Sequence, residues 1–127
     1  MILDTCALLW LASGSKRLSV ATRREIEQAP FLYLSAISGF EIAHKEAEGK
    51  LQLGKPTGEW FEAVVDHHGL SIMSVDLETC IAAVELPRIH DDPFDRIIIA
   101  TAHLNGWPVV TEDGRFKEYE ITVIGCR

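Results

Sequence analysis

Four acidic residues that lie far apart in the chain have side chains that could do chemistry: Asp4, Glu41, Asp95 and Asp113. Each comes just after an expected strand or in the first turn of the expected helix that follows. Taken singly, each is explained more simply as a helix cap, because such side chains satisfy unpaired backbone N–H groups at helix starts. Four acids at equivalent positions are harder to attribute to capping alone.

Carboxylates gathered in one place without basic partners repel one another and are driven toward protonation. A hard divalent cation removes this repulsion, and a ligand set made only of oxygens favours Mg²⁺ or Mn²⁺ over zinc. A metal site of this kind activates water and neutralises charge on a phosphoryl group. If the four acids meet, they therefore predict metal-dependent hydrolysis of a phosphodiester.

The segment around Asp95 indicates how one of these acids is held. Asp92 suits an N-cap, Pro93 suits the first helical position, and Asp95 falls at the third, where a carboxylate faces unpaired N–H groups. Isoleucines at 97–99 leave this helix no polar face, so its body is predicted to be buried. A short apolar run also fits a buried strand, but the continuation to Leu104 favours a helix.

Strands and helices are expected to alternate along the chain. The alternation predicts a three-layer α/β/α domain with a five-stranded, mainly parallel sheet. In such sheets the working residues lie just beyond the carboxyl ends of the strands, where the four acids are placed. Either Ser35 or Ser38 can cap the helix that carries Glu41. The expected strands are 1–3, 31–34, 70–75, 107–111 and 121–124, and the expected helices begin near residues 6, 20, 38, 59, 77 and 93.

Size and composition predict a single domain over residues 1–127. No stretch approaches the roughly 18 apolar residues of a membrane span. The amino-terminal residues lack the basic region and apolar core of a signal peptide. Cys6, Cys80 and Cys126 form no C-x-x-C pair, so we expect unpaired thiols and no zinc site. Together these features predict a cytoplasmic protein that does not associate with membranes.

The net charge of −7 and the pI near 5.1 argue against broad electrostatic binding of nucleic acid. They do not exclude nucleic acid as a substrate, because a divalent metal bound in an acidic site inverts the local charge.

Four short motifs follow one another along the chain: Asp4-Thr5, Ser35-x-x-Ser38-x-x-Glu41, Asp92-Pro93-Phe94-Asp95-Arg96 and Thr111-x-Asp113. In this order they resemble the motifs of PIN-domain proteins, and most closely those of the toxins of VapBC-type toxin–antitoxin pairs. The resemblance covers residues 1–127. It implies Mg²⁺- or Mn²⁺-dependent endoribonuclease activity, inhibition by a cognate antitoxin, and dimerisation. It further implies roles for seven residues: Asp4, Glu41, Asp95 and Asp113 as metal-site acids, Thr5 and Ser38 as nearby hydroxyls, and Arg96 as the base beside the third acid.

An acidic crevice would also suit a basic side chain of the antitoxin. We expect an apolar antitoxin helix to lie near Trp10, Leu11 and the stretch 20–28. From there it would extend an Arg or Lys toward Asp4, Glu41 and Asp95. Leu11 fits the protein core at least as well.

Other classes of protein stay open at this point. A phosphoacceptor receiver domain requires paired acids after the first strand and a late lysine, but Asp4 is followed by Thr5. A haloacid-dehalogenase-type phosphatase requires a second Asp where this chain has Cys6. A non-catalytic binding module with the same fold is the third alternative. Metal-dependent cleavage of RNA would separate these classes.

Overall fold

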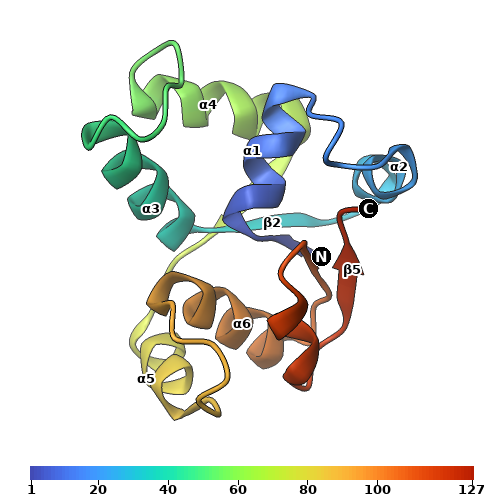
Figure 1. Cartoon of the computed structure of the whole chain (residues 1–127), viewed down its shortest axis with the longest axis vertical. Helices are drawn as coiled ribbons and strands as arrows, with labels where there is room; N and C mark the ends of the chain where they lie inside the picture. The colour runs from blue at the N-terminus through green and yellow to red at the C-terminus, as the bar shows by residue number, and fades with distance from the viewer.

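The computed structural model describes residues 1–127 and is built on a five-stranded sheet in the order β3-β2-β1-β4-β5 (Figure 1). All four pairings between neighbouring strands are parallel, which confirms the expected α/β class. The strands are β1 (Ile2–Leu3), β2 (Leu32–Ser35), β3 (Leu70–Met73), β4 (Val109–Thr111) and β5 (Val123–Gly125).

Helices cover both faces of this sheet, so the predicted three-layer arrangement is confirmed (Figure 1). In Figure 1, α1, α3 and α4 lie on one face, and α5 and α6 lie on the other. The helices are α1 (Thr5–Ser13), α2 (Val20–Gln28), α3 (Ala36–Ala47), α4 (Thr57–His68), α5 (Leu77–Glu85) and α6 (Pro93–Asn105), with a 3₁₀ helix η1 (Gly114–Glu118). None of them combines the length and the hydropathy that a membrane-crossing helix requires.

Strand β1 has only two residues, yet it lies at the centre of the sheet, between β2 and β4. Its side chains point to opposite faces, as successive residues of a strand do. Ile2 packs with the apolar residues of α6, and Leu3 packs with those of α1 and α3, and both are fully buried. Because β1 is held on both edges and both faces, Asp4 at its end occupies a fixed position.

The start of α6 agrees with the sequence prediction. Asp92 Oδ1 accepts hydrogen bonds from the N–H groups of Phe94 at 2.8 Å and Asp95 at 3.2 Å, and Pro93 is the first helical residue. The helix ends at Asn105 and is capped by Gly106, whose φ of 68° is readily adopted by glycine. Residues 98–102 are buried, which confirms the expected burial of the helix body.

The expectation for α3 was partly wrong. Ser35 is the cap, accepting from the N–H of Ile37 at 3.2 Å, so the helix begins at Ala36. Glu41 therefore lies in the second turn rather than the first, and Ser38 is not a cap. Strand β4 also starts later than expected, at Val109, because Pro108 has no N–H to donate to a neighbouring strand.

Candidate active site

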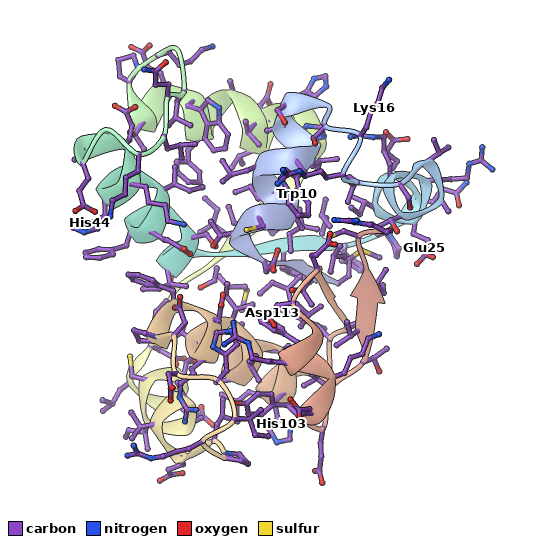
Figure 2. All side chains as sticks on the ribbon, in the orientation of Figure 1. Trp10, Lys16, Glu25, His44, His103 and Asp113 are labelled. Atoms are coloured by element: carbon purple, nitrogen blue, oxygen red, sulfur yellow. The ribbon has the colours of Figure 1, made fainter.

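The structure brings the four acids to one edge of the sheet. Asp4 follows β1 directly, and Asp113 lies two residues beyond β4, between the two helical layers (Figure 2). Asp95 comes from the first turn of α6, and Glu41 from α3. They are close enough for their charges to interact. In addition to burial, the charges of Glu41 and Asp113 raise the pKa of Asp4, and those of Asp4 and Glu41 raise the pKa of Asp95. The carboxyl ends of parallel strands converge here, as expected.

Asp4 is both a helix cap and a member of this acidic cluster. Its Oδ1 accepts from the N–H of Ala7 at 2.8 Å, and its Oδ2 accepts from Thr111 Oγ1 at 2.6 Å. Burial raises the pKa of Asp4 to about 6, the two hydrogen bonds oppose this rise, and the nearby charges of Glu41 and Asp113 add to it. The fold therefore holds a carboxylate in a place where its negative charge is unfavourable.

Glu41 has one oxygen with a partner and one without. Its Oε2 lies 3.1 Å from Lys45 Nζ, one helical turn further along α3. Its Oε1 is buried and has no hydrogen-bond partner. An unpartnered buried carboxylate oxygen is costly, so this atom is suited to a ligand that can accept its lone pair.

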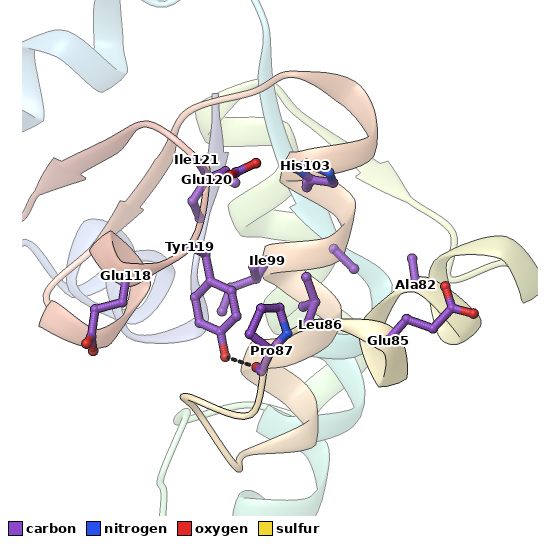
Figure 3. A pocket seen from close by; sticks show the side chains of 11 residues that line it. Ala82, Glu85, Leu86, Pro87, Ile99, His103, Glu118, Tyr119, Glu120 and Ile121 are labelled. Carbon is purple, nitrogen blue, oxygen red and sulfur yellow. Dashed lines mark hydrogen bonds between the residues drawn. The ribbon is translucent and has the colours of Figure 1, made fainter.

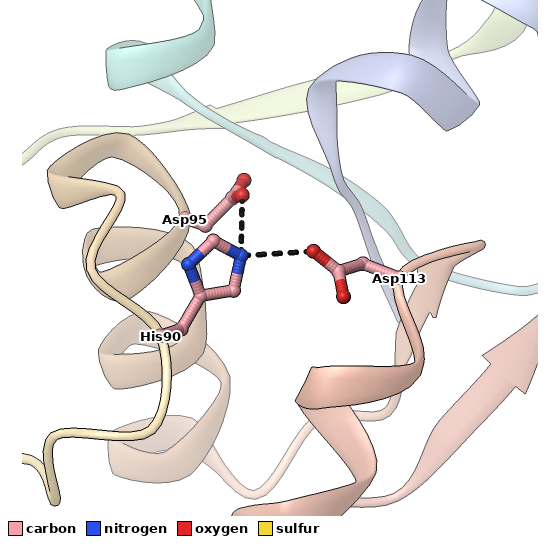
Figure 4. A group of neighbouring side chains, drawn as sticks. All are labelled: His90, Asp95 and Asp113. Carbon is pink, nitrogen blue, oxygen red and sulfur yellow. Dashed lines mark hydrogen bonds and ion pairs between the residues drawn. The ribbon is translucent and has the colours of Figure 1, made fainter.

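Asp95 and Asp113 meet at the imidazole of His90 (Figure 4). His90 Nε2 lies 2.9 Å from Asp95 Oδ2 and 2.8 Å from Asp113 Oδ2. Burial, followed by the charge of Asp92, raises the pKa of Asp95 to about 7, and His90 opposes that rise. Hydrogen bonds from Arg115 are the main reason that the pKa of Asp113 falls to about 2. The two carboxyls therefore differ in charge state near neutral pH.

The two predicted hydroxyls form a pair of their own. Thr5 Oγ1 and Ser38 Oγ are 2.9 Å apart, and both residues are buried. Their hydrogen bond joins the start of α1 to α3, which sets the position of Glu41 relative to Asp4.

Arg96 lies elsewhere than expected. Its guanidinium contacts none of the four acids, and instead donates to backbone carbonyls of the segment before α6. The acceptors are the carbonyl oxygens of Val84 (3.3 Å), Leu86 (2.8 Å), Pro87 (3.0 Å) and His90 (2.9 Å). A role for Arg96 in the site therefore stays a prediction, and the contacts of its guanidinium are with the backbone. Arg96 is adjacent to Asp95 in sequence, but its long side chain reaches carbonyls that would otherwise lack donors.

We expect Arg96→Lys to lower the free energy of unfolding by about 2 kcal/mol, because an ammonium group cannot replace the fork of guanidinium donors. Urea denaturation would measure this loss. Arg88→Lys is the matched control, since Arg88 is exposed, and we expect no measurable change there. Arg96→Lys with wild-type stability would contradict the structural role.

Sequence reasoning gave no role to four residues that contact the acids, although one of them, Thr111, stands in the fourth motif. The four are Lys45, His90, Thr111 and Arg115. Lys45 sits four residues after Glu41, a helical spacing at which opposite charges pair, so this contact was available in the sequence. Arg115 donates from Nε and Nη2 to Asp113 at 3.1 and 2.8 Å, and is two residues away. His90 and Thr111 reach partners 23 and 107 residues away, which no local pattern indicates.

The residues present fit a divalent cation. Four carboxyl groups lie near enough for their charges to influence one another, one of their buried oxygens has no partner, and the pKa values of Asp4 and Asp95 are raised by burial and by neighbouring acids. A bound cation would satisfy the free oxygen and offset the repulsion. The oxygens of Asp95 and Asp113 that face His90 lie within 4.8 Å of each other, close enough to share one ion.

Comparison with known proteins identifies the family. The sequence profile described as the PIN domain matches residues 1–121. The chain belongs to the PIN-domain family. This PIN-domain chain is 33% identical over 120 residues to a protein named Ribonuclease VapC22 from Mycobacterium tuberculosis (strain ATCC 25618 / H37Rv), and the alignment covers 94% of the chain and 91% of the relative. The resemblance read from the four motifs is thereby confirmed.

Solved structures share the fold of this PIN-domain chain. VapBC2 from Rickettsia felis, bound to a DNA fragment from the promoter, matches with a TM-score of 0.73 at 13% identity, covering 98% of this chain and 96% of that one. A toxin–antitoxin complex from Klebsiella pneumoniae matches with a TM-score of 0.70 at 19% identity, covering 99% and 97%. At these identities the likeness shows the fold alone, and it confirms the expected α/β/α architecture.

Proposed function

We propose that this PIN-domain protein is the endoribonuclease toxin of a type II toxin–antitoxin pair, and that Asp4, Glu41, Asp95 and Asp113 hold the Mg²⁺ or Mn²⁺ on which RNA hydrolysis depends. The observation that carries the proposal is the buried, unpartnered oxygen of Glu41 at the place where the other three acids converge. The name and coverage of the mycobacterial ribonuclease support the choice of RNA as substrate.

When bound, the metal would activate water and neutralise charge on the phosphodiester. The chain itself supplies the placement of the ligands. Thr111 and the N–H of Ala7 orient the two oxygens of Asp4, while the pair Thr5–Ser38 ties α1 to α3. This placement leaves Glu41 Oε1 free for the ion.

Two cationic side chains are placed to meet the RNA backbone. Lys45 pairs with Glu41, and the side chain of Arg115, which is 55% exposed, pairs with Asp113. If Glu41 and Asp113 bound a metal ion, Lys45 and Arg115 would lose part of their ion pairing. Their cationic groups would then be available to bind phosphate oxygens. Local positive charge of this kind would let a chain of net charge −7 bind an RNA strand.

The rival functions receive less support from the site. A thiol nucleophile at Cys6 is disfavoured, because burial and the charge of Asp4 raise the pKa of Cys6 to about 11. A receiver-type site lacks the second acid beside Asp4, where the chain has Thr5. A phosphatase-type site would use Asp4 as a nucleophile, whereas both of its oxygens accept hydrogen bonds, one from the N–H of Ala7 and one from Thr111. A non-catalytic binding module would not require all four acids, and this chain has all of them.

The test is cleavage of single-stranded RNA by the purified protein, with Mn²⁺ or Mg²⁺ and with EDTA, followed by mapping of the RNA ends. We expect discrete cuts with metal and none with EDTA. Asp91→Asn is the matched control, since Asp91 is exposed and adjacent to the site. RNA left intact by metal-loaded protein would favour the binding module, and cleavage that persists in EDTA would contradict the metal site.

The cognate antitoxin is proposed to place an Arg or Lys among the same acids, in competition with the metal. Leu11 is 2% exposed and belongs to the core, so it drops out of the expected docking surface, whereas the Trp10 ring is partly exposed beneath Arg17. Binding of an antitoxin peptide should weaken with added Mn²⁺ and with Glu41→Gln, and affinity indifferent to both would contradict occupation of the site. Dimerisation stays a prediction, which sedimentation of the purified protein would check.

All three cysteines are free, as the sequence predicted. We expect Cys6→Ser to retain metal-dependent cleavage within about threefold, because the raised pKa of Cys6 keeps the thiol protonated and unreactive near neutral pH. Cleavage rates with Mn²⁺ would measure this, with Cys80→Ser as the control at an exposed position remote from the acids. Loss of cleavage in Cys6→Ser with Mn²⁺ binding intact would point to thiol chemistry instead.

A further inference from the structure

His90 lies in the segment that links α5 to α6, and it is buried and held from several sides. His90 is 2% exposed. Its backbone N–H donates to Tyr119 Oη at 2.9 Å, and its backbone carbonyl accepts from Arg96 Nη1 at 2.9 Å. Its ring stands edge-on to Phe116, with ring centroids 5.8 Å apart. Tyr119, which lines a pocket of about 470 Å³ behind this segment, donates in turn to the carbonyl of Pro87 at 3.0 Å (Figure 3). The orientation of the imidazole is therefore set by its surroundings.

A hydrogen bond at the far side of the ring assigns its tautomer. The backbone N–H of Asp92 donates to His90 Nδ1 at 3.1 Å. A ring nitrogen that accepts a hydrogen bond uses its lone pair and carries no proton. The proton of the neutral ring is therefore on Nε2, the nitrogen that faces the two acids. Nε2 acts as a donor, shared between Asp95 Oδ2 at 2.9 Å and Asp113 Oδ2 at 2.8 Å.

The same three side chains could instead be considered a His-Asp-Asp metal site. Coordination through Nε2 would require the ring proton to move to Nδ1, where it would meet the N–H of Asp92 head-on. Asp92 cannot withdraw, because it caps α6 through the N–H groups of Phe94 and Asp95. Two buried donors facing each other would lose one hydrogen bond and gain a repulsion. The backbone at Asp92 therefore excludes His90 from the ligand set.

We infer that His90 is a positioning residue of the proposed metal site: its Nε2–H joins Asp95 to Asp113 and fixes the spacing of their carboxylates, and the imidazole is not itself a ligand. The inference rests on the proposed function, since the spacing matters only if these acids share an ion. Two oxygens bound to one Mg²⁺ lie about 3–4 Å apart, and the His90 bridge keeps these within 4.8 Å. Hydrogen bonds that orient metal ligands contribute about 10- to 100-fold to metal affinity.

The first test is the tautomer, observed by NMR of ¹⁵N-labelled imidazole in the wild-type protein, both in EDTA and loaded with Mg²⁺. We expect Nε2 to carry the proton and Nδ1 to be a hydrogen-bond acceptor under both conditions. A proton on Nδ1 in either sample, or an Nε2 that loses its proton when Mg²⁺ binds, would overturn the inference. This measurement needs neither a variant nor RNA.

The second test is Mn²⁺ affinity, measured by titration for His90→Ala and His90→Gln, with thermal unfolding to verify the fold. We expect His90→Ala to bind Mn²⁺ about 10- to 100-fold more weakly. His90→Gln should recover most of this loss, because its amide N–H groups can donate from nearly the position of Nε2. His103→Ala, at an exposed position on α6, is the control with unchanged affinity.

The outcomes separate the two claims. Wild-type affinity in His90→Ala would overturn the role of His90 and leave the proposed metal site standing. A folded His90→Gln that binds Mn²⁺ no better than His90→Ala would show that the imidazole itself is required, which also overturns the inference. A wild-type protein that binds no Mn²⁺ would contradict both the proposed metal site and the role of His90. This outcome is distinguishable from the first two, because Mn²⁺ binding is then absent in the unsubstituted protein.

Discussion

Asp95→Asn is expected to abolish metal-dependent RNA cleavage and, in the same protein, to stabilise the metal-free fold. The amide keeps an oxygen that can accept from His90 Nε2, but it carries no negative charge. Because burial and Asp92 raise the pKa of Asp95 to about 7, the ionised carboxylate destabilises the fold at about pH 8. Its removal should raise the free energy of unfolding there by roughly 4 kcal/mol, the equivalent of a shift of about three pKa units, measured by urea denaturation in EDTA.

Two neighbouring substitutions serve as controls for Asp95→Asn. Asp91→Asn removes the same charge from an exposed position, and we expect both cleavage and stability to be unchanged. Asp92→Asn keeps an oxygen able to cap α6, and should change stability by about 1 kcal/mol or less while cleavage persists. Equal loss of cleavage in Asp92→Asn and Asp95→Asn at equal stability would contradict the division between cap and metal ligand.

The metal-free protein should become less stable as the pH rises from about 5 to about 8. The pKa values of Asp4 and Asp95 are raised from 3.8 to about 6 and about 7, so the folded state holds protons that the unfolded chain releases. Stability therefore falls as the pH rises, from above the unfolded value of 3.8 until both groups are ionised at about pH 8. Asp113, with a pKa of about 2, stays ionised throughout and adds no slope.

For Asp4 alone, a shift of about two pKa units corresponds to roughly 3 kcal/mol over the whole titration; about half of this is lost between about pH 5 and about pH 8, which corresponds to a fall in Tm of about 5 °C. Scanning calorimetry in EDTA across this pH range would measure it. Mn²⁺ at about 100 times its Kd should restore about 2.7 kcal/mol at about pH 8, and less at about pH 5, where protons compete for the same oxygens. A Tm independent of pH in EDTA, or equal stabilisation by Mn²⁺ at both pH values, would contradict this account of the acids.

Local chemistry is what made much of the fold predictable. Asp92 and Pro93 mark the start of α6, and Ser19 and Asp76 mark the starts of α2 and α5, because caps act on backbone within three residues. The alternation of apolar strands with these helices was enough for the parallel sheet. The same logic placed all four acids at one edge, since the carboxyl ends of parallel strands converge there.

Long-range contacts are where sequence reasoning failed. Ser35 and Ser38 both have capping chemistry, so the sequence could not choose between them. In the structure Ser35 caps α3, and the hydroxyl of Ser38 is instead bonded to Thr5, 33 residues away. The resemblance implied a role for Arg96 beside the third acid, yet the partners of its guanidinium are backbone carbonyls, which leave no signature in the sequence. His90 went unassigned for a similar reason, because its partner Asp113 lies in another element.

The most direct test of the central claim is anomalous diffraction from crystals of the wild-type protein grown with Mn²⁺. The account predicts a Mn²⁺ peak among the carboxylates of Asp4, Glu41, Asp95 and Asp113, with Glu41 Oε1 as a ligand and His90 Nε2 outside the ligand set. A site without a Mn²⁺ peak, or a peak bound to His90 Nε2 and away from Glu41, would contradict it.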